Sequence, residues 1–240
     1  KAGKGSYYIN SVACEDSNRN LHSGDTTDGA SVKLEKASSS SSQKWILREE
    51  PEREPESPAE IAAKVFDSWY KSFDMESVNG HFWDNAEMME IVLDALEVTV
   101  NPRYRTMFEA MYRNFIKKNG DDWQYNKYND DIAWAVLFSV RGYLLTGNQA
   151  YIEKAKDQFD KMYARAFTNS YGGGLLWYHT KTTKNSCING PAMVACCYLA
   201  RATGDSTYYD KAIALYTWSK VYLFDAATGK VNDNVDLDPE

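Results

Sequence analysis

Two consecutive carboxylates, Asp130 and Asp131, stand at the start of the most apolar segment of the chain, residues 132–138, and have Tyr128 and Trp134 close by in the sequence. A pair of carboxylates among aromatic rings is typical of glycosidic bond hydrolysis. One acid stays ionised to attack or stabilise the anomeric carbon, and the other gives a proton to the leaving oxygen. Mutual repulsion and partial burial raise the pKa of one of the two acids, which separates these roles.

The same pair also has a simpler structural explanation. Asn129 or Asp130 can cap the helix that begins here, and Asp131 can interact favourably with the positive end of the helix dipole. A cap needs one carboxylate rather than two. The sequence by itself leaves both interpretations open.

Three further segments combine aromatic rings with polar side chains and are candidates to line the same cavity. Residues 81–85 are predicted to form the turn before a helix, residues 171–179 a short hairpin with three glycines, and residues 184–191 the entry to another helix. Glycine permits a positive φ or a close backbone approach. The side chains predicted to contact a sugar are Trp83, Asp84, Asn85, Tyr128, Asn129, Trp134, Trp177, Asn185 and Asn189. Ordinary turn chemistry and core packing explain these segments about equally well.

Several other chemistries find no support in the sequence. His22, His81 and His179 are far apart without metal-ligand spacing, and no Cys-x-x-Cys pair occurs. The glycine patterns of serine hydrolases, phosphate-binding loops and dinucleotide-binding domains are also missing. Cys196 and Cys197 lie in an apolar helical pattern and are predicted to be packing residues. We therefore expect neither a metal ion nor an organic cofactor.

Residues after Pro58 follow a helical pattern. The expected helices cover residues 59–73, 85–99, 102–118, 131–145, 148–167, 188–203 and 205–223. Residues 148–167 are amphipathic, whereas residues 132–138 are apolar on every face and require an inner position. Alternating buried and amphipathic helices indicate an α/α toroid or an α-solenoid, and the number of helices is too high for a four-helix bundle.

An internal repeat supports this interpretation. Residues 146–155 are echoed by residues 203–212, and a fainter copy begins at Thr99. Each copy joins the end of one helix to the capped start of the next. The repeat therefore predicts helical hairpins of similar construction.

The composition changes near residue 50. Residues 1–47 are rich in Ser, Gly, Asn and Asp, and their short apolar groups at 7–9, 32–34 and 45–47 predict strands separated by turns. Residues 48–58 contain three of the six prolines together with five glutamates, which predicts an extended linker. The expected division is a β-rich segment at 1–47, a linker at 48–58 and a helical domain at 59–240.

The chain of 240 residues has 27 Lys and Arg against 34 Asp and Glu, a net charge of −7. Nucleic-acid binding is not expected, because phosphate contacts need clustered cations. No apolar run approaches the ~20 residues that span a bilayer, so no transmembrane segment is expected. The first residues lack the apolar core of a signal peptide, and we expect an internal or processed start.

Five segments between about residue 59 and residue 235 together resemble glycoside hydrolase family 76, the endo-acting α-1,6-mannanases. They are Phe82-Trp83-Asp84, Tyr128-Asn129-Asp130-Asp131-x-x-Trp134, Gly173-Gly174-Leu175-x-Trp177, Lys184-Asn185-x-x-x-Asn189-Gly190-Pro191, and the stretch from Tyr198 to Asp205. The resemblance implies an (α/α)6 toroid whose central cleft binds α-1,6-linked mannan or mannooligosaccharides and retains the anomeric configuration. It also implies that Asp130 is the nucleophile and Asp131 the general acid/base.

Residues 1–47 are similar to one repeat of a ricin-type β-trefoil lectin, on the basis of Tyr8-Ile9-Asn10, residues 29–34 and Gln43-Lys44-Trp45. A complete trefoil has three such repeats, and the toroid has twelve helices where seven are expected here. We therefore expect a chain that is incomplete at both ends.

The favoured hypothesis is a retaining endo-hydrolase of α-1,6-mannan. One alternative is a carbohydrate-binding protein that keeps a glycosidase-like cleft without turnover. Another is a helical-repeat interaction module without affinity for sugars. We expect a monomer, and the polymeric substrate implies a secreted, cell-surface or periplasmic location.

Overall fold

A computed structural model describes residues 19–23, 32–36, 56–72, 74–180 and 183–236. The chain divides into two compact units, Lys1–Ser57 and Pro58–Glu240. In the first unit, β1 (Arg19–Ser23) pairs antiparallel with β2 (Val32–Lys36). The predicted strand at 32–34 is confirmed. The apolar groups at 7–9 and 45–47 and most of the predicted linker at 48–58 lie outside the described residues, so the similarity to a lectin repeat stays a prediction.

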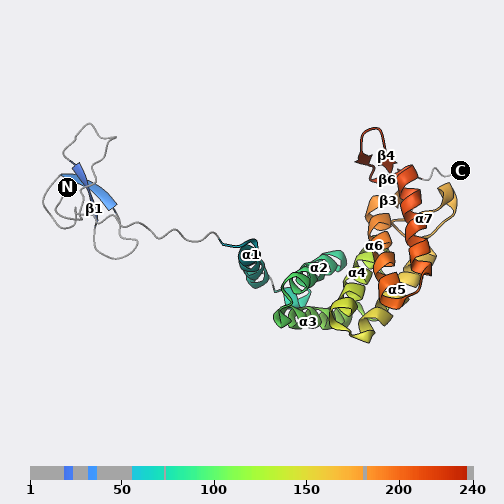
Figure 1. The fold of residues 1–240 in the computed structure, drawn as a ribbon, viewed down its shortest axis with the longest axis horizontal. Coiled ribbons are helices and arrows are strands. Elements are labelled where there is room, and N and C mark those ends of the chain that lie inside the picture. The colour runs from blue at the N-terminus through green and yellow to red at the C-terminus, as the bar shows by residue number, and fades with distance from the viewer. Residues whose placement is uncertain (1–18, 24–31, 37–55, 73, 181–182, 237–240) are drawn as a thin grey trace. The chain divides into compact units, whose positions relative to one another are not determined.

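The second unit contains seven α-helices within the described residues (Figure 1). They are α1 (Pro58–Ser72), α2 (Phe82–Thr99), α3 (Pro102–Asn119), α4 (Asn129–Thr146), α5 (Gln149–Ala166), α6 (Ser186–Thr203) and α7 (Thr207–Tyr222). Two short 3₁₀ helices, η2 (Met75–Ser77) and η3 (Ser170–Gly172), lie in the loops. All seven predicted helices are confirmed, although their ends differ from the predicted ones by up to three residues.

The helices of the second unit form two rows. Helix α4 is central, because it packs against α2, α5 and α6, and the other closely packed pairs are α2 with α3 and α6 with α7. Helices α2, α4 and α6 therefore form an inner row, and α3, α5 and α7 pack behind it. Figure 1 shows this unit as an arc with the inner row on its concave side. The arrangement of α/α hairpins confirms the predicted, mainly α fold of the toroid class.

The inner position of α4 is also confirmed. Eleven of its residues, from Asn129 to Gly142, are buried. Close packing behind it depends on Gly142, because a Cβ atom at this position would lie 2.6 Å from the ring of Phe108 in α3. A helix that is apolar on all faces must be covered on all sides, and α4 is the helix with neighbours on three sides.

The inner helices begin earlier than the sequence predicts. Helix α2 begins at Phe82 rather than at residue 85, α4 at Asn129 rather than at 131, and α6 at Ser186 rather than at 188. Tyr128 and Asn185 precede α4 and α6 with extended backbone and without a side-chain cap. Sequence rules locate a helix start by its capping side chain, so they miss such starts.

The turn that follows each inner helix is built in the same way three times, which confirms the predicted repeat. In each copy a threonine hydroxyl accepts a hydrogen bond, 3.1–3.3 Å long, from the main-chain N–H two residues later. These threonines are Thr99, Thr146 and Thr203. The next residue is left-handed in every copy: Gly147 and Gly204 have φ of 77° and 74°, and Val100 has φ of 54°. Glycine adopts this conformation without strain, but a β-branched residue does not.

Replacing Val100 by glycine is expected to raise the free energy of unfolding by about 1 kcal/mol, because it removes the strain of a left-handed valine. Val100 is 80% exposed, so little packing is lost. Denaturant unfolding of the two proteins measures the difference. The reciprocal variant Gly204→Val is the matched control and should be destabilised. A Val100→Gly protein that is less stable than the parent contradicts the argument.

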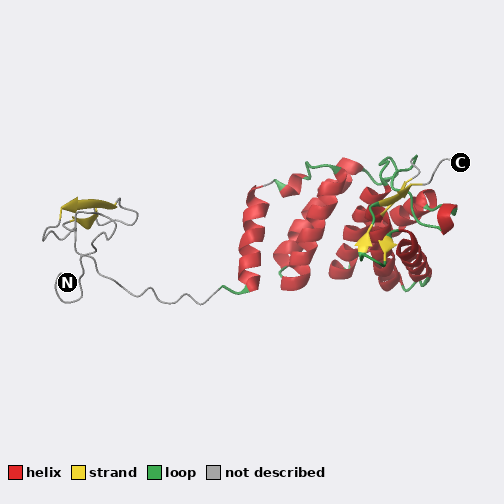
Figure 2. Ribbon diagram, turned by 90° about the horizontal axis from the view of Figure 1, so that it is seen from above, coloured by secondary structure: helices red, strands yellow, loops and turns green. Residues whose placement is uncertain are grey.

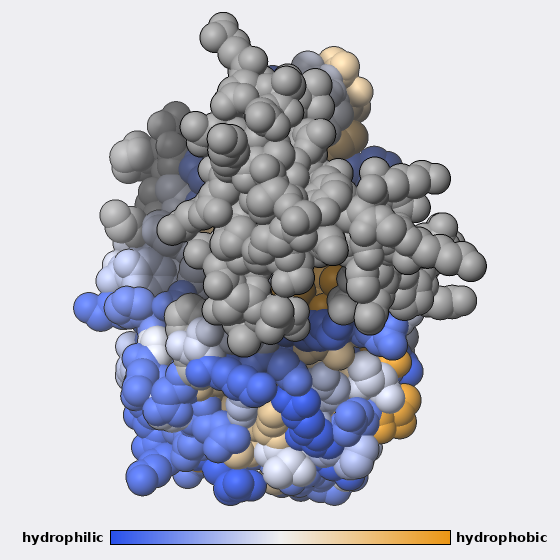
Figure 3. All heavy atoms as spheres, turned by 90° about the vertical axis from the view of Figure 1, so that its left-hand side faces the viewer, coloured by the Kyte–Doolittle hydropathy of each residue, from blue (hydrophilic) through white to orange (hydrophobic). Residues whose placement is uncertain are grey.

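The chain after α7 returns to the start of α6. Strand β6 (Asn234–Asp236) pairs antiparallel with β3 (Thr183–Asn185), and β4 (Phe224–Asp225) pairs with β5 (Lys230–Val231). Figure 2 shows these strands beside the helices. Among the described residues, no helix is long and apolar enough to cross a membrane. The described side chains visible in Figure 3 are mainly hydrophilic, with small hydrophobic patches.

Candidate active site

The first turns of the three inner helices meet at one end of the inner row. Asp84 of α2 lies close enough to Asp131 of α4 for its charge to raise the pKa of that acid. The thiol of Cys187, in the first turn of α6, lies close enough to Asp130 to lower the pKa of that acid. The structure thus brings together the predicted segments at 81–85, 128–134 and 184–191, which are far apart in the sequence.

Asp130 and Asp131 are half-buried, and each accepts a hydrogen bond from a side chain outside α4. The indole N–H of Trp177 donates to Asp130 Oδ2 at 2.9 Å, and Asn126 Nδ2 donates to Asp131 Oδ2 at 2.9 Å. The second oxygen of Asp130, Oδ1, is buried and has no hydrogen-bond partner within the described residues. Buried polar atoms of this kind are rare, and they call for a functional explanation.

The capping interpretation is wrong about which residue caps α4. The N-cap position is occupied by Tyr128, so neither Asn129 nor Asp130 is the cap. Asn129 instead donates from Nδ2 to the carbonyl of Leu176 at 2.8 Å and accepts from Arg165 Nε at 2.7 Å. The positive end of the helix was predicted to act on Asp131. In the structure the main-chain N–H groups of this turn lower the pKa of Asp130.

Burial raises the pKa of both acids, but the groups that lower it again differ between the two. Burial is the largest cause at Asp131; the charges of Asp130 and Asp84 raise it further, the amide of Asn126 lowers it, and the pKa is about 6. At Asp130 burial again raises the pKa, whereas the nearby Cys187 thiol, the indole N–H of Trp177 and main-chain N–H groups lower it. More donors therefore stabilise Asp130 as a carboxylate, and Asp131 keeps its proton to a higher pH than an ordinary aspartate.

Aromatic rings flank the acid pair. The ring of Tyr128 lies 5.3 Å from that of Trp177 and 5.0 Å from that of Tyr178, measured between centroids. Tyr128 is 41% exposed, and Trp83 is 48% exposed, with its indole N–H bonded to Glu87 at 3.0 Å. Exposed aromatic faces beside carboxylates are suited to stacking on the apolar faces of sugar rings.

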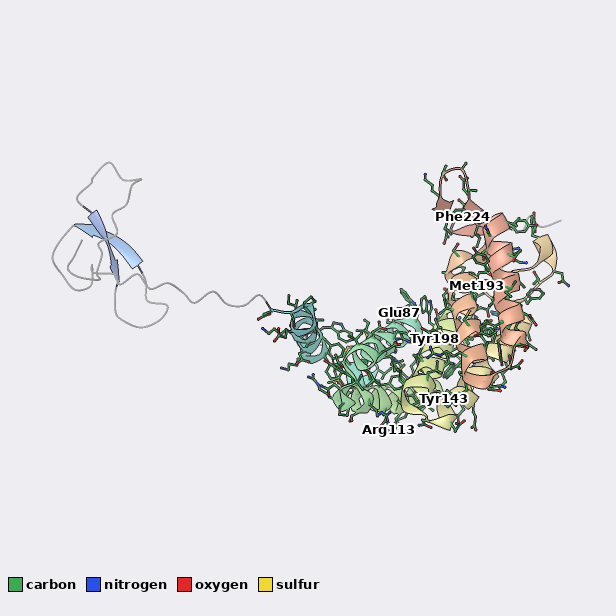
Figure 4. The ribbon with its side chains drawn as sticks, viewed as in Figure 1. Glu87, Arg113, Tyr143, Met193, Tyr198 and Phe224 are labelled. Carbon is green, nitrogen blue, oxygen red and sulfur yellow. The ribbon has the colours of Figure 1, made fainter. Side chains whose placement is uncertain are left out.

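A hollow of about 680 Å³ lies along the inner helices; neither Asp130 nor Asp131 lines it, but Cys187, which lowers the pKa of Asp130, does. Its lining includes Glu90 of α2, Trp134, Leu137 and Arg141 of α4, and Cys187, Met193 and Tyr198 of α6. Figure 4 shows Met193 and Tyr198 on the concave side of the arc, together with Glu87, and Arg113 on the outer side. The volume is within the ~300–1,000 Å³ range of small-molecule sites.

An ion-pair network that no sequence pattern indicated contributes Glu90 and Arg141 to one wall of this hollow. Arg141 of α4 bonds to Glu90 at 2.5 Å, Asp94 at 2.7 Å and Glu97 at 2.9 Å, all in α2. Burial raises the pKa of Glu90 to about 7, although Arg141 opposes the rise. The network ties α2 to α4 and makes this wall polar.

Three of the predicted sugar-binding asparagines lie beneath the surface. Asn85, Asn129 and Asn189 are at most 1% exposed. Asn85 bonds to the carbonyl of Gly80 at 2.9 Å, and Asn189 both accepts from the main-chain N–H of Leu175 at 2.9 Å and donates to its carbonyl at 3.2 Å. These buried side chains hold the main chain of neighbouring segments, and their placement does not support the prediction that they contact a sugar directly.

Asp84 and Asn185 are placed differently from these asparagines. Asp84 is half-buried and accepts a hydrogen bond from the main-chain N–H of His81 at 3.3 Å. Asn185 is 7% exposed, and its Oδ1 atom has no hydrogen-bond partner within the described residues. Both side chains therefore keep hydrogen-bonding capacity at the end of the inner row where the acid pair lies.

The hairpin that carries Trp177 is anchored by a buried lysine. Lys184 is 0% exposed and donates to the carbonyls of Thr168 at 3.1 Å and Ser170 at 2.6 Å and to that of Gly173. The three glycines at 172–174 have φ of 74°, 129° and 83°, which confirms that this turn needs positive φ.

Replacing Lys184 by methionine is expected to lower the free energy of unfolding by about 2–4 kcal/mol, because three carbonyls lose a charged donor. Thermal or denaturant unfolding measures the loss. Lys117→Met, which removes an exposed lysine of α3, is the control and should leave stability nearly unchanged. Equal stability of the two variants contradicts the anchoring role.

Asn126, Arg165 and Cys187 contact the site but were not identified from the sequence. Asn126 carries a weak signal, since an asparagine two residues before a helix boundary often forms a turn. Its contact with Asp131 is visible only in the folded chain. Of the two adjacent cysteines, Cys196 is buried as predicted and Cys197 is exposed, so only the first is a packing residue.

The part of the chain that the structure describes has no group of three or more His, Cys, Asp or Glu side chains arranged to hold a metal ion. The chemistry that the arrangement can perform is that of two carboxylates with unequal proton affinity. Such a pair can combine nucleophilic attack with proton transfer at a single bond.

Comparison with known proteins gives matches that cover most of the helical unit. The model of glycosyl hydrolase family 76 matches residues 55–240. The chain is similar to the α-1,6-mannanase GH76A of Salegentibacter sp. HEL1_6, with 28% identity and a TM-score of 0.70 over 76% of this chain and 57% of that one. A second structure of the same enzyme is an inactive variant, with two consecutive aspartates replaced by alanine, in complex with α-1,6-mannotetrose. This chain is similar to it with a TM-score of 0.71 and 26% identity, over 77% of this chain and 57% of that one.

A curated relative has a different name. D-mannose isomerase of Marinomonas mediterranea is 26% identical over 196 residues, which are 66% of this chain and 49% of the relative. The chain therefore spans about half the length of this relative and 57% of the mannanase chains.

Proposed function

The chain belongs to glycosyl hydrolase family 76, and from this we propose that it cleaves α-1,6-mannosidic bonds inside mannan chains with retention of the anomeric configuration. The observation that carries the proposal is the half-buried pair of Asp130 and Asp131, each with its own hydrogen-bond donor, at the shared end of the inner helices. Retaining glycoside hydrolysis requires one ionised and one protonated carboxyl group, and the surroundings of this pair favour that division.

The sequence contains a second pair of consecutive aspartates, Asp121 and Asp122. Their side chains are 87% and 62% exposed and form ion pairs with lysines of α5. Both carboxylates therefore face solvent and are not enclosed by the inner helices. Of the two aspartate pairs in this chain, the half-buried pair is therefore the better candidate for the counterpart of the two aspartates that are replaced in the inactive Salegentibacter variant.

The proposed order of roles follows from the surroundings of each acid. A carboxylate oxygen of Asp130 attacks the anomeric carbon, the bond to the leaving oxygen breaks, and Asp131 gives its proton to that oxygen. Asp131, now ionised, takes a proton from water, which attacks the mannosyl–Asp130 ester and releases the second product. The higher proton affinity at Asp131, with a pKa of about 6, supports its role as the acid.

The substrate class rests on the bound sugar of the related enzyme and on the lining of this site. The Salegentibacter variant is in complex with α-1,6-mannotetrose. In this chain the exposed rings of Trp83 and Tyr128 stand at the starts of α2 and α4 and offer stacking faces for sugar units. The hollow of about 680 Å³ extends along the inner helices from Cys187 and leaves room for further units. We also propose that the protein acts as a monomer, outside the cytoplasm, where such polymers occur.

Incubation with linear α-1,6-mannan tests the proposal. We expect internal cleavage to short oligosaccharides, and proton NMR at early times should show the α-anomer at each new reducing end. An α-1,2-linked mannooligosaccharide is the control and should remain intact. New reducing ends that first appear as the β-anomer contradict the retaining mechanism.

Two other outcomes favour other functions. Formation of a ketose from D-mannose without cleavage of mannan would indicate an isomerase, like the curated relative from Marinomonas mediterranea. Calorimetric binding of mannooligosaccharides without any new reducing ends would indicate a carbohydrate-binding protein.

A further inference from the structure

Arg165, in the last turn of the outer helix α5, directs all of its guanidinium nitrogens to the loop before α4 and to the first residue of that helix. Nε donates to Asn129 Oδ1 at 2.7 Å, Nη1 donates to the carbonyl of Gln124 at 2.8 Å, and Nη2 donates to the carbonyl of Asn126 at 2.7 Å. Each of these acceptors is an uncharged oxygen. A planar guanidinium with three acceptors fixes their relative positions, which a flexible lysine cannot do.

The first consequence is the orientation of Asn126. Its carbonyl is held by Arg165, and its side-chain Oδ1 accepts a hydrogen bond from the main-chain N–H of Tyr128 at 3.0 Å. With the main chain and one end of the amide fixed, the other end, Nδ2, is aimed at Asp131 Oδ2 at 2.9 Å. The donor to Asp131 therefore depends on a loop that α5 holds in place.

The second consequence reaches the other acid. Asn129, whose Oδ1 atom is held by Arg165, donates from Nδ2 to the carbonyl of Leu176 at 2.8 Å. Its main-chain N–H donates to the carbonyl of Trp177 at 2.8 Å. Trp177 is the donor to Asp130 Oδ2. One arginine is thus linked, through one residue on each side, to the donors of both acids.

We propose that Arg165 is a positioning residue for the acid pair, which it serves by holding Asn126 against Asp131 and the Trp177 hairpin against Asp130. Arg165 does not contact either carboxylate in the described residues, so its effect is indirect. The catalytic consequence rests on the proposed mannanase function; the effect on the carboxylates themselves does not.

The expected signature is a change in the titration of Asp131. The titratable groups facing the acid pair are Asp84 of α2, Cys187 of α6 and Asp233, which precedes β6 and acts on Cys187. None of them is a cation, so Asn126 supplies the stabilisation of ionised Asp131 that opposes burial and repulsion. Loss of that donor should raise the pKa of Asp131 by about half to one unit, since a hydrogen bond to the charged form lowers a carboxyl pKa.

The test compares Arg165→Met, Arg165→Lys and Asn126→Ala in the full chain, with Arg113→Met as the control. Arg113 is an exposed arginine of the outer helix α3 without contact to the loop (Figure 4). Two quantities are measured: the carbon-13 NMR titration of the Asp131 carboxyl group, assigned by its loss in Asp131→Asn, and the pH profile of mannan hydrolysis. We expect an upward shift of both the titration and the alkaline limb in Arg165→Met and Asn126→Ala, a smaller shift in Arg165→Lys, and none in the control.

Combining Arg165→Met with Asn126→Ala should shift the Asp131 titration no further than either change alone, because Arg165 reaches Asp131 through the Asn126 hydrogen bond. If Arg165→Met does not fold, Arg165→Lys and Asn126→Ala still decide the question. An unchanged Asp131 titration in the arginine variants overturns the positioning role. A shifted titration in a protein that does not cleave mannan supports the positioning role and overturns the proposed function instead.

Discussion

Replacing Asp130 by asparagine is expected to reduce the rate of α-1,6-mannan cleavage by a factor on the order of 10⁴ or more, because the attacking oxygen is lost. The amide keeps the shape of the side chain and can still accept the hydrogen bond from Trp177. Binding of mannooligosaccharides should therefore persist while turnover stops. Reducing-end assays and calorimetry with mannotetraose measure the two effects separately.

Asp121→Asn is the matched control for this variant. It makes the same chemical change at the other aspartate pair, where the side chain is 87% exposed. It should retain the parental rate of mannan cleavage. If Asp130→Asn retains the parental rate instead, Asp130 is not the nucleophile, and the proposed mechanism is wrong.

Replacing Asp131 by asparagine is expected to lower the rate on mannan by a factor on the order of 10²–10⁴, because the departing sugar oxygen no longer receives a proton. A mannoside with a good leaving group, such as dinitrophenolate, needs no such proton. Its first step should be nearly unaffected, and added azide should restore turnover, since azide attacks the mannosyl–Asp130 ester without a base. The parental enzyme should lose activity as the pH rises through about 6, the pKa of Asp131.

The stability of this variant provides the control for folding. Burial raises the pKa of Asp131 from 3.8 to about 6, so the folded state binds a proton more tightly than the unfolded state. Stability is therefore lost as the pH rises between these values, and at pH 7 the ionised side chain is destabilising. Asp131→Asn should be at least as stable as the parent at pH 7. Lower stability together with lost azide rescue contradicts the assignment of Asp131 as the acid/base.

The positions of the helices could be predicted from the sequence because they depend on local periodicity. The all-apolar run at 132–138 placed α4 in the inner row, and the repeated turn after Thr99, Thr146 and Thr203 predicted the hairpins. Both signals act over a few residues of chain, so they survive without knowledge of the partner helices. The helix starts were predicted less well, since Tyr128 makes no side-chain cap.

The roles of the candidate site residues were harder to predict. Asn85, Asn129 and Asn189 look like exposed polar residues near turns, but the folded chain buries them under loops from other segments. Asn126 gave only a weak turn signal and Arg165 gave none, because their distances from the acid pair depend on how α5 and the loop before α4 pack against α4. A buried amide and a sugar-binding amide have the same local sequence and differ only in their tertiary neighbours.

The sequence alone determined that this chain forms helical hairpins and that two adjacent carboxylates stand at the start of its most apolar helix, since both follow from residue type and spacing. Only the tertiary structure decided which donors reach those carboxylates and therefore how the two acids differ. Proton affinity depends on burial, on charges such as that of Asp84, and on donors from Asn126 and Trp177, and these come from segments that meet only when the inner helices pack side by side.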